Sequence, residues 1–362
     1  MRRSIPLLSM AVVLLAACIG GGTERTQTTS PGISPSGPTT ADSPTASPLP
    51  ELRTDWSIPP FHELVRMFDY DASQPLDFTE VSQIRVHGAT VHVIEYRSSG
   101  HVVKAELVLP EGTGPFPVVL YAPGSRAGTP FFQPDAVALA RDGYAGLIVI
   151  APESRPPYLC LWWDCLEARR NIRAFVAWAT DLRRGVDLLQ TLPAIDAGRV
   201  GFVGHDEGGV VGSILSGVDA RIDAYVLQVA EGYWTDWIRI LHERGEGYNT
   251  DEGRLTHAQL VRYQERIAVL NPVNYIGHSQ GAAFLFQGAE AEETLTGLTR
   301  ANFLALFEAA PEPKILRWYE GDVWLGCAGP GHMSFHSLID VGGCDPSVPA
   351  FVDHRAWLGK NV

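Results

Sequence analysis

The distribution of apolar residues along most of the chain alternates between short continuous runs and longer amphipathic stretches. The runs have strand length and end at Gly or Pro, as expected for strands buried on both faces. In 168–192, apolar residues recur at intervals of three and four, which predicts a long helix packed on one side. The expected strands are 116–125, 145–154, 198–204, 222–230, 282–288 and 314–321. The expected helices are 134–144, 168–192, 207–218, 293–310 and 350–362.

The order of these elements predicts an α/β fold. Strands that alternate with helices form a mainly parallel, doubly wound sheet covered on both faces. The first strand-like segments, 83–98 and 102–112, have no helix between them, so we expect an antiparallel edge. An additional, mostly helical stretch at 231–272 interrupts the alternation and predicts a small helical insertion, a candidate cap.

The N-terminal 51 residues differ from this pattern. Met-Arg-Arg and a short apolar run predict a signal peptide over 1–18, too short for a stable membrane-spanning helix. It ends in Leu-Ala-Ala-Cys, which resembles a bacterial lipobox and implies lipidation of Cys18. The alternative is an ordinary signal peptide with a chance cysteine. Residues 19–51 are rich in Ser, Thr, Pro and Gly and predict a flexible tether before a domain at 52–362. We therefore expect an exported protein, lipid-anchored to the bacterial cell envelope.

The cysteines agree with export. Apart from Cys18 there are four, Cys160, Cys165, Cys327 and Cys344, an even number that predicts two disulfides in an oxidising compartment. Local pairing is favoured, but the connectivity stays open. A zinc site is the rival, and the absence of a close Cys-x2-Cys pair argues against it.

The net charge limits the classes of partner that the protein can bind. The net charge of −13 and the pI of about 5.3 repel phosphate backbones, so we expect no nucleic acid partner. The expected partner is a small-molecule substrate or ligand, with membrane contact through the lipid anchor alone. No metal and no cofactor are expected.

One short motif carries the candidate chemistry. Residues 199–211 read Arg-Val-Gly-Phe-Val-Gly-His-Asp-Glu-Gly-Gly-Val-Val, an apolar run, a glycine-rich turn and helix-compatible sequence. This is the outline of a Gly-x-Ser-x-Gly nucleophile elbow in which Asp206 holds the serine position. Gly204 and Gly208 supply the small neighbours that such a turn needs. A plain glycine-rich turn is the alternative, and the flanking strand and helix argue against it.

Three segments together resemble the α/β-hydrolases, in particular the dienelactone-hydrolase and acyl-peptidase-like group. They are 116–128, 192–228 and 270–295, and the resemblance extends over roughly 84–361. It implies an α/β-hydrolase fold with Asp206 in place of the usual serine. It also implies oxyanion donors at the amide of Glu207 and in the loop near Gly124 and Ser125.

The resemblance further implies an acid and a histidine that follow the nucleophile in this order. The acid is expected after 282–288, at Glu292, with Glu290 as second choice and a solvated acidic turn as the alternative. The histidine is expected after 314–321, at His332, with His336 in reserve.

Two further histidines are assigned structural roles. His205 is common before the nucleophile in this group and packs there, and His354 lies in the closing helix.

A second motif competes with the elbow. Residues 277–281 read Gly-His-Ser-Gln-Gly, so Ser279 is a formal alternative nucleophile. An elbow needs a helix after the nucleophile, whereas a strand follows Ser279 at once. Few residues remain after it for the other strands and for both triad partners.

The chemistry open to Asp206 leaves two hypotheses. A carboxylate is ionised at neutral pH and can attack directly, as in haloalkane dehalogenases and epoxide hydrolases, whose elbow Gly-His-Asp-Glu-Gly-Gly resembles. Two of their features are missing, because Glu207 follows the Asp where a Trp binds halide, and the loop at 123–126 reads Pro-Gly-Ser-Arg. Attack on an ordinary ester would give an anhydride, so a catalytically silent binding protein is the alternative.

Aromatic residues near the expected site are candidate pocket walls. They are Trp162, Trp163, Tyr233, Trp234 and Trp237. Packing between the helical insertion and the core is the alternative role, and the one that we favour for the last three.

Overall fold

The structure is a computed structural model that describes residues 52–124, 128–152, 167–244, 255–290, 299–321, 325 and 345–362. The signal peptide and tether expected at 1–18 and 19–51 lie outside these ranges, as do all five cysteines. The lipid anchor and the disulfides therefore stay predictions.

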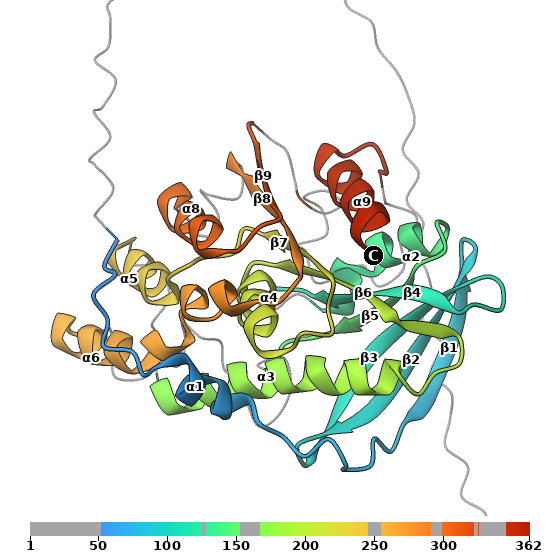
Figure 1. The fold of residues 1–362 in the computed structure, drawn as a ribbon, viewed down its shortest axis with the longest axis horizontal. Coiled ribbons are helices and arrows are strands. Elements are labelled where there is room, and N and C mark those ends of the chain that lie inside the picture. Colours follow the sequence, from blue (N-terminus) through green and yellow to red (C-terminus); the bar gives the residue numbers. More distant parts are fainter. Residues whose placement is uncertain are drawn as a thin grey trace, which may run out of the picture. The chain divides into compact units, whose positions relative to one another are not determined.

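One mixed sheet organises the domain (Figure 1). Its nine strands within the described ranges lie in the order β1-β2-β3-β5-β4-β6-β7-β8-β9, and all neighbours from β5 onward are parallel. The bounds are β1 Thr79–Val86, β2 Ala89–Ser98, β3 His101–Pro110, β4 Phe116–Ala122, β5 Ala145–Val149, β6 Ile195–His205, β7 Ala224–Gln228, β8 Ala283–Ala289 and β9 Lys314–Tyr319. The alternation of apolar runs with amphipathic stretches predicted this mainly parallel sheet, and it is confirmed.

The antiparallel edge is also confirmed, with one correction. The sequence predicted a single strand over 83–98, but the chain reverses at His87 and Gly88 and forms β1 and β2. Both turn residues have positive φ, 48° and 86°, the conformation that a two-residue hairpin requires. His-Gly is an unusual pair for such a turn, and strand-like sequence lies on both sides of it. The sequence therefore contains no clear signal of a hairpin at this point.

Helices cover both faces of the sheet. Two buried apolar clusters lie on its opposite sides, a larger one beneath α3 and α4 and a smaller one beneath α2 and α9. Glycines allow close packing, because a Cβ on Gly185 of α3 would lie 3.0 Å from Leu147 in β5. The α-helices are α1 Phe61–Leu64, α2 Gln133–Ala140, α3 Ala168–Leu189, α4 Glu207–Val218, α5 Trp234–Arg244, α6 His257–Ile267, α8 Arg300–Ala309 and α9 Pro349–Asn361. Short 3-10 turns are η1 Val65–Phe68, η2 Thr129–Phe131, η4 Ala268–Leu270, η5 Pro272–Asn274 and η6 Ile276–His278.

The helical stretch expected at 231–272 contains α5 and α6. Thr256 and Gln259 form a reciprocal capping box that starts α6. The two helices pack on α3, where Asn171 donates a hydrogen bond of 2.7 Å to the hydroxyl of Tyr263. Whether this insertion caps a site stays a prediction. Among the described helices, none has both the length and the apolar character that a membrane crossing requires.

Candidate functional site

The turn between β6 and α4 has the geometry of a nucleophile elbow. Asp206 directly follows β6 with φ 55° and ψ −123°, and α4 begins at the next residue. Residues with a Cβ rarely adopt this backbone conformation, which costs about 1–3 kcal/mol and persists only where surrounding contacts enforce it. The strand, turn and helix predicted from the motif are therefore present, while the role of Asp206 stays a prediction.

The glycines around Asp206 are required by close backbone contacts. A Cβ on Gly208 would lie 1.8 Å from the carbonyl oxygen of Ala122, at the end of β4. A Cβ on Gly204 would lie 2.3 Å from the carbonyl oxygen of Gly208. Because backbone atoms cannot move aside as a flexible side chain can, these positions exclude any other residue and hold β4 against the elbow.

The end of β4 also lies directly beside the Asp206 carboxyl group. A Cβ on Gly124 would be 2.9 Å from Cβ of Asp206 and 3.0 Å from its Oδ2. The loop that the resemblance names as the oxyanion loop therefore starts next to the carboxylate. Ser125, expected to supply the second oxyanion donor, lies outside the described residues.

Backbone hydrogen bonds fix the elbow to its neighbours. The Asp206 N–H donates to the carbonyl oxygen of Gln228 at 3.0 Å, and its own carbonyl oxygen accepts from Val210 N–H at 3.0 Å. The amide of Glu207 follows at the start of α4, where N–H groups without intrahelical partners and the helix dipole favour negative charge. Its position is suited to the oxyanion donor that the sequence predicts.

A second strained turn lies beside the elbow, after β7. Val229 has φ 44°, unusual for a β-branched residue, and donates its N–H to the carbonyl oxygen of Gln287 at 2.9 Å. The turn packs on the first turn of α4, because a Cβ on Gly209 would lie 2.8 Å from Cβ of Ala230. Glu231 comes next and is fully buried.

The side chains of Glu207 and Glu231 form a buried acidic pair, which we call the elbow acids. Both are completely inaccessible to solvent. Burial, and secondly the charge of Glu207, raise the pKa of Glu231 well above its usual value. Within the described residues, neither carboxyl oxygen of Glu231 has a hydrogen-bond partner apart from the backbone N–H of Glu231 itself, whose effect on the pKa is smaller than that of burial or of Glu207. Glu231 was not among the residues that the sequence indicated, because an acid after an apolar strand is typical of an ordinary strand terminus.

Side-chain amides connect the carboxyl ends of the next strands. Gln228 donates to Gln287 Oε1 at 3.0 Å and to the carbonyl oxygen of Leu325 at 3.1 Å. Gln287 in turn donates to the hydroxyl of Tyr319 at 3.0 Å and to the carbonyl oxygen of Ala350 at 2.7 Å. This amide chain connects the strand that receives the Asp206 N–H with the start of α9.

Most of the expected partners of Asp206 lie in segments that the structure does not describe. These are Glu292, His332, His336, Trp162 and Trp163. Glu290 is described, is exposed, and accepts a hydrogen bond of 2.8 Å from Gly321 N–H. The structure therefore brings together Asp206, the Glu207 amide, Gly124 and Glu231, and leaves the acid and histidine assignments as predictions.

Ser279 does not occupy an elbow. It has extended backbone, with φ −60° and ψ 138°, and stands between η6 and the beginning of β8. Since β6 and β8 run in the same direction, the amino end of β8 lies at the opposite edge of the sheet from Asp206. This geometry agrees with the choice of Asp206 over Ser279.

The expected pocket residues Tyr233 and Trp234 differ in exposure. Tyr233 is half-buried, and both its backbone groups bond to the Asn302 side chain, at 2.7 and 3.0 Å. Trp234 is fully buried, stacked on Trp237 at 4.5 Å and edge-on to Phe175 at 5.1 Å. The surroundings of Trp234 favour the packing role over that of a pocket wall.

The two histidines expected to be structural are both buried. His205 lies against the ring of Phe131, with centroids 4.7 Å apart. His354 lies on the buried face of α9, with Nε2 3.9 Å from Oδ2 of Asp135. Burial lowers the pKa of His354 to about 3. It is therefore neutral at physiological pH.

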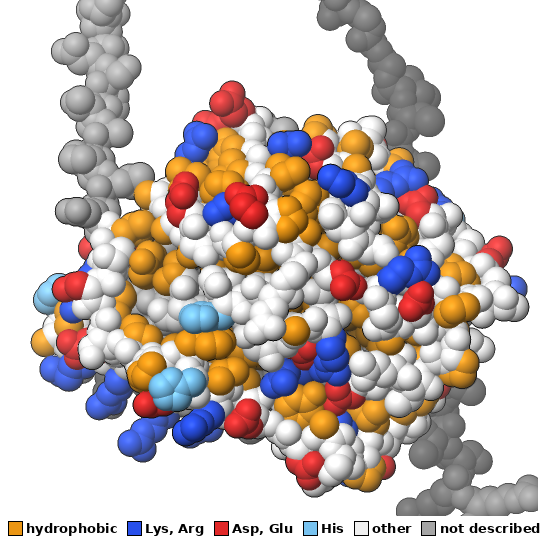
Figure 2. Space-filling view, in the orientation of Figure 1, with side chains coloured by type: hydrophobic (Ala, Val, Ile, Leu, Met, Phe, Trp, Pro, Cys, Tyr) orange, Lys and Arg blue, Asp and Glu red, His pale blue; other side chains and the backbone are white. Residues whose placement is uncertain are grey.

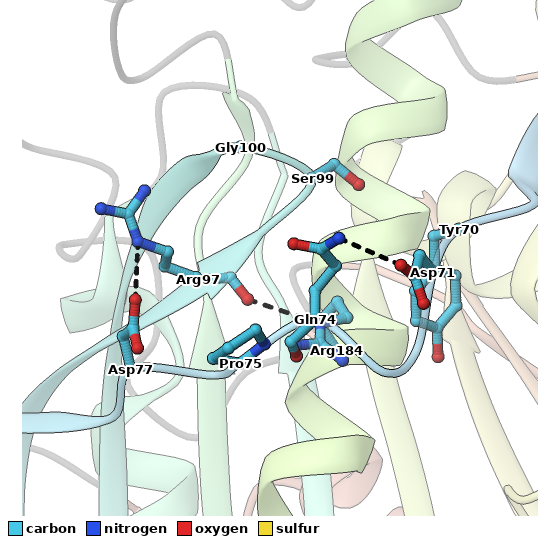
Figure 3. A pocket seen from close by; sticks show the side chains of 9 residues that line it. All are labelled: Tyr70, Asp71, Gln74, Pro75, Asp77, Arg97, Ser99, Gly100 and Arg184. Carbon is cyan, nitrogen blue, oxygen red and sulfur yellow. Dashed lines mark hydrogen bonds and ion pairs between the residues drawn. The ribbon is translucent and has the colours of Figure 1, made fainter.

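A hollow of about 660 Å³ lies away from the elbow (Figure 3). Its residues come from 70–77, the end of β2, the β2–β3 turn and α3, and none belongs to β6, α4 or the turn after β7. Arg184 is engaged there by the carbonyl oxygens of Ala72 and Gln74, at 3.1 and 2.7 Å, and by Asp187 at 2.8 Å. We therefore assign this arginine to fastening the segment before β1 onto α3.

No group of three or more metal-ligating side chains is arranged to hold an ion within the part of the chain that the structure describes. On the face seen in Figure 2, acidic, basic and apolar side chains are interspersed.

Comparison with known proteins identifies the fold. No family profile matches the chain, and no curated protein matches it in sequence. Among solved structures, acetyl xylan esterase 1 from Thermoanaerobacterium sp. JW/SL YS485 is similar, with a TM-score of 0.58 and 16% identity. An acetyl xylan esterase from Paenibacillus sp. R4 has a TM-score of 0.54 and 16% identity. Each match covers 72% of this chain and 86% of the other. The domain thus has the α/β-hydrolase fold, as the resemblance implied.

Proposed function

We propose that the chain is an exported, lipid-anchored hydrolase of small molecules in which Asp206 is the nucleophile. The observation that carries this proposal is the strained backbone of Asp206 at the start of α4, with φ 55°. Such strain is retained where it positions a reacting group, and here it presents a carboxylate beside Gly124 and the Glu207 amide.

The proposed reaction has two covalent steps. A carboxylate oxygen of Asp206 forms a bond to an electrophilic carbon of the substrate, and the bond from that carbon to the leaving group breaks with its electron pair. Water then attacks the carboxyl carbon of the Asp206 ester, the alcohol departs, and the carboxylate is restored. In this scheme His332 takes the proton from water and passes it to the departing alcohol oxygen, and Glu292 orients the histidine.

Substrates with a reactive alkyl carbon, such as epoxides, suit this nucleophile better than ordinary esters. Attack on an acyl carbon gives an anhydride, from which Asp206 leaves readily in the reverse direction. The negative charge of Asp206 would also oppose an oxyanion forming nearby. Because the fold is shared with acetyl xylan esterases, acetyl esters are the natural counter-screen.

A second candidate function is a catalytically silent binding protein that has lost the nucleophilic serine. The elbow acids favour it, because Glu207 and Glu231 place further carboxyl groups beneath the turn where a hydrolase stabilises an oxyanion. Under this hypothesis the elbow geometry is retained from a hydrolase ancestor and has no catalytic role.

The experiment compares wild type, Asp206→Ser and Asp206→Ala on epoxides, alkyl halides and aryl acetates in oxygen-18 water. Wild-type turnover should place heavy oxygen in Asp206, because water cleaves the ester at its carboxyl carbon. Tandem mass spectrometry of the tryptic peptide 200–221 locates the label, and Asp206→Ala is the inactive control. Turnover without label would eliminate the Asp nucleophile.

The same variants test the silent alternative. Inactive wild type together with aryl acetate hydrolysis by Asp206→Ser would indicate a binding protein whose remaining machinery is intact. If all three proteins are inactive on every substrate class, the chain shares only the fold with hydrolases.

A further inference from the structure

The turn that carries Glu231 is fixed from two directions. On one side, Ala230 packs against Gly209 in the first turn of α4. On the other, Gly232 donates its N–H to the carbonyl oxygen of Asn302 at 3.2 Å and accepts from Val273 N–H at 3.2 Å. With the strained Val229 before it, this turn places Glu231 at a defined position behind the elbow. Glu231 is therefore buried by a turn that has defined contacts on both sides.

Among the residues that the structure describes, no cationic group acts on Glu231. The ionisable groups that act on it are Glu207 at the start of α4 and Asp236 on α5. Asp236 forms an ion pair with Arg239, whose Nη2 lies 2.6 Å from Oδ1 of Asp236. The elements on the other side of the turn, α8 and η5, contribute Asn302 and backbone groups within the described residues. An ionised Glu231 would thus be a buried charge next to like charges, the least favourable arrangement for a carboxylate.

We propose that Glu231 is a positioning residue of the Asp206 site, a neutral carboxylic acid that limits the negative charge beneath the elbow. Asp206, Glu207 and Glu231 follow adjacent parallel strands and would carry three charges if all were ionised. With Glu231 neutral, the amides at the start of α4 face less opposing charge when a leaving group or oxyanion develops. This proposal deepens the proposed function and rests on it for its catalytic part.

The protonation state of Glu231 can be tested without any substrate. The variants are Glu231→Gln, a neutral side chain of the same shape, and Glu265→Gln, an exposed glutamate on α6, as the matched control. Infrared spectra of folded wild type at neutral pH should contain a carboxylic acid carbonyl band that Glu231→Gln lacks and Glu265→Gln keeps. Absence of this band from wild type would overturn the proposal.

Unfolding measured against pH provides a second readout. The folded protein binds a proton on Glu231 that the unfolded chain releases above the ordinary value of 4.5. As pH rises above that value, this group lowers the folded-to-unfolded ratio by up to about tenfold per pH unit, until Glu231 ionises in the folded state. Glu231→Gln should be stabilised relative to wild type as pH rises, whereas Glu265→Gln should follow wild type. Parallel curves for all three proteins would contradict the proposal.

The catalytic part is tested on whichever of wild type and Asp206→Ser is active. Ionisation of Glu231 should lower kcat, with little effect on KM, at the alkaline end of the pH profile. Glu231→Gln, whose side chain cannot ionise, should lose this alkaline decline. A uniform fall in kcat with an unchanged profile would mean that Glu231 only supports the fold. If neither protein is active, the proposed function fails, while the infrared and unfolding results still decide the state of Glu231.

Discussion

Replacement of Asp206 by glycine should give a more stable protein than replacement by alanine, which is the opposite of the order at most positions. The backbone at Asp206, with φ 55° and ψ −123°, is strained for any residue with a Cβ and relaxed for glycine. Comparing Asp206→Gly with Asp206→Ala separates this backbone effect from the loss of the carboxyl group, because both variants lack it and only alanine keeps the Cβ.

The expected magnitude follows from two opposing contributions. Relief of strain contributes about 1–3 kcal/mol in favour of glycine. The greater freedom of glycine in the unfolded chain costs about 0.5–1 kcal/mol. Asp206→Gly should therefore exceed Asp206→Ala in unfolding free energy by about 1 kcal/mol. For the domain at 52–362, the average unfolding entropy per residue converts this to roughly 1.5 °C in Tm.

Denaturant unfolding at constant m-value is the assay, with Ala301→Gly as the control of opposite sign. Ala301 is exposed in the first turn of α8, where glycine should cost up to about 1 kcal/mol. If Asp206→Gly is less stable than Asp206→Ala by the same amount, the backbone at 206 is not strained and the elbow geometry is wrong.

Three further outcomes are expected. Gly208→Ala should lose about 3 kcal/mol or more, or fail to accumulate folded, because its Cβ would meet the carbonyl oxygen of Ala122 at 1.8 Å; a loss below about 1 kcal/mol in denaturant unfolding would contradict the packing. His354, with its pKa lowered to about 3 from 6.5, should make stability fall as pH drops through this window, by up to about 1.4 kcal/mol per unit, since the unfolded chain takes up the proton first. His354→Gln should show a shallower acid limb, and an unchanged limb would count against burial as the cause. Cys18→Ala should abolish labelling by a palmitate analogue, and equal labelling would disprove the anchor.

The sequence predicted the fold well because its signals were local and repeated. Buried parallel strands have continuous apolar runs, and the helix at α3 has a clear periodicity, so the order of the elements determined the class of sheet. The error at the edge arose at His87 and Gly88, where a tight turn interrupts sequence that is strand-like on both sides. A turn of this kind depends on backbone conformation, which residue type indicates only weakly.

The site was predictable in part. The motif identified Asp206 and the glycines, since close contacts at Gly204 and Gly208 exclude other residues and leave a recognisable pattern. Glu231 could not be found, because its burial and its proximity to Glu207 depend on the packing of β7 against β6. The strain at Val229 is likewise invisible in the sequence.

The positive φ of Asp206 also bears on how the site can change during evolution. No single nucleotide change converts an aspartate codon into a serine codon, and the two-step routes pass through asparagine, glycine, alanine or tyrosine. At most positions of a fold a glycine intermediate would lower stability. At position 206 the backbone already has a conformation that glycine adopts without strain. A lineage could therefore exchange the aspartate for a serine, or the reverse, through a glycine form that loses the side chain without losing the fold.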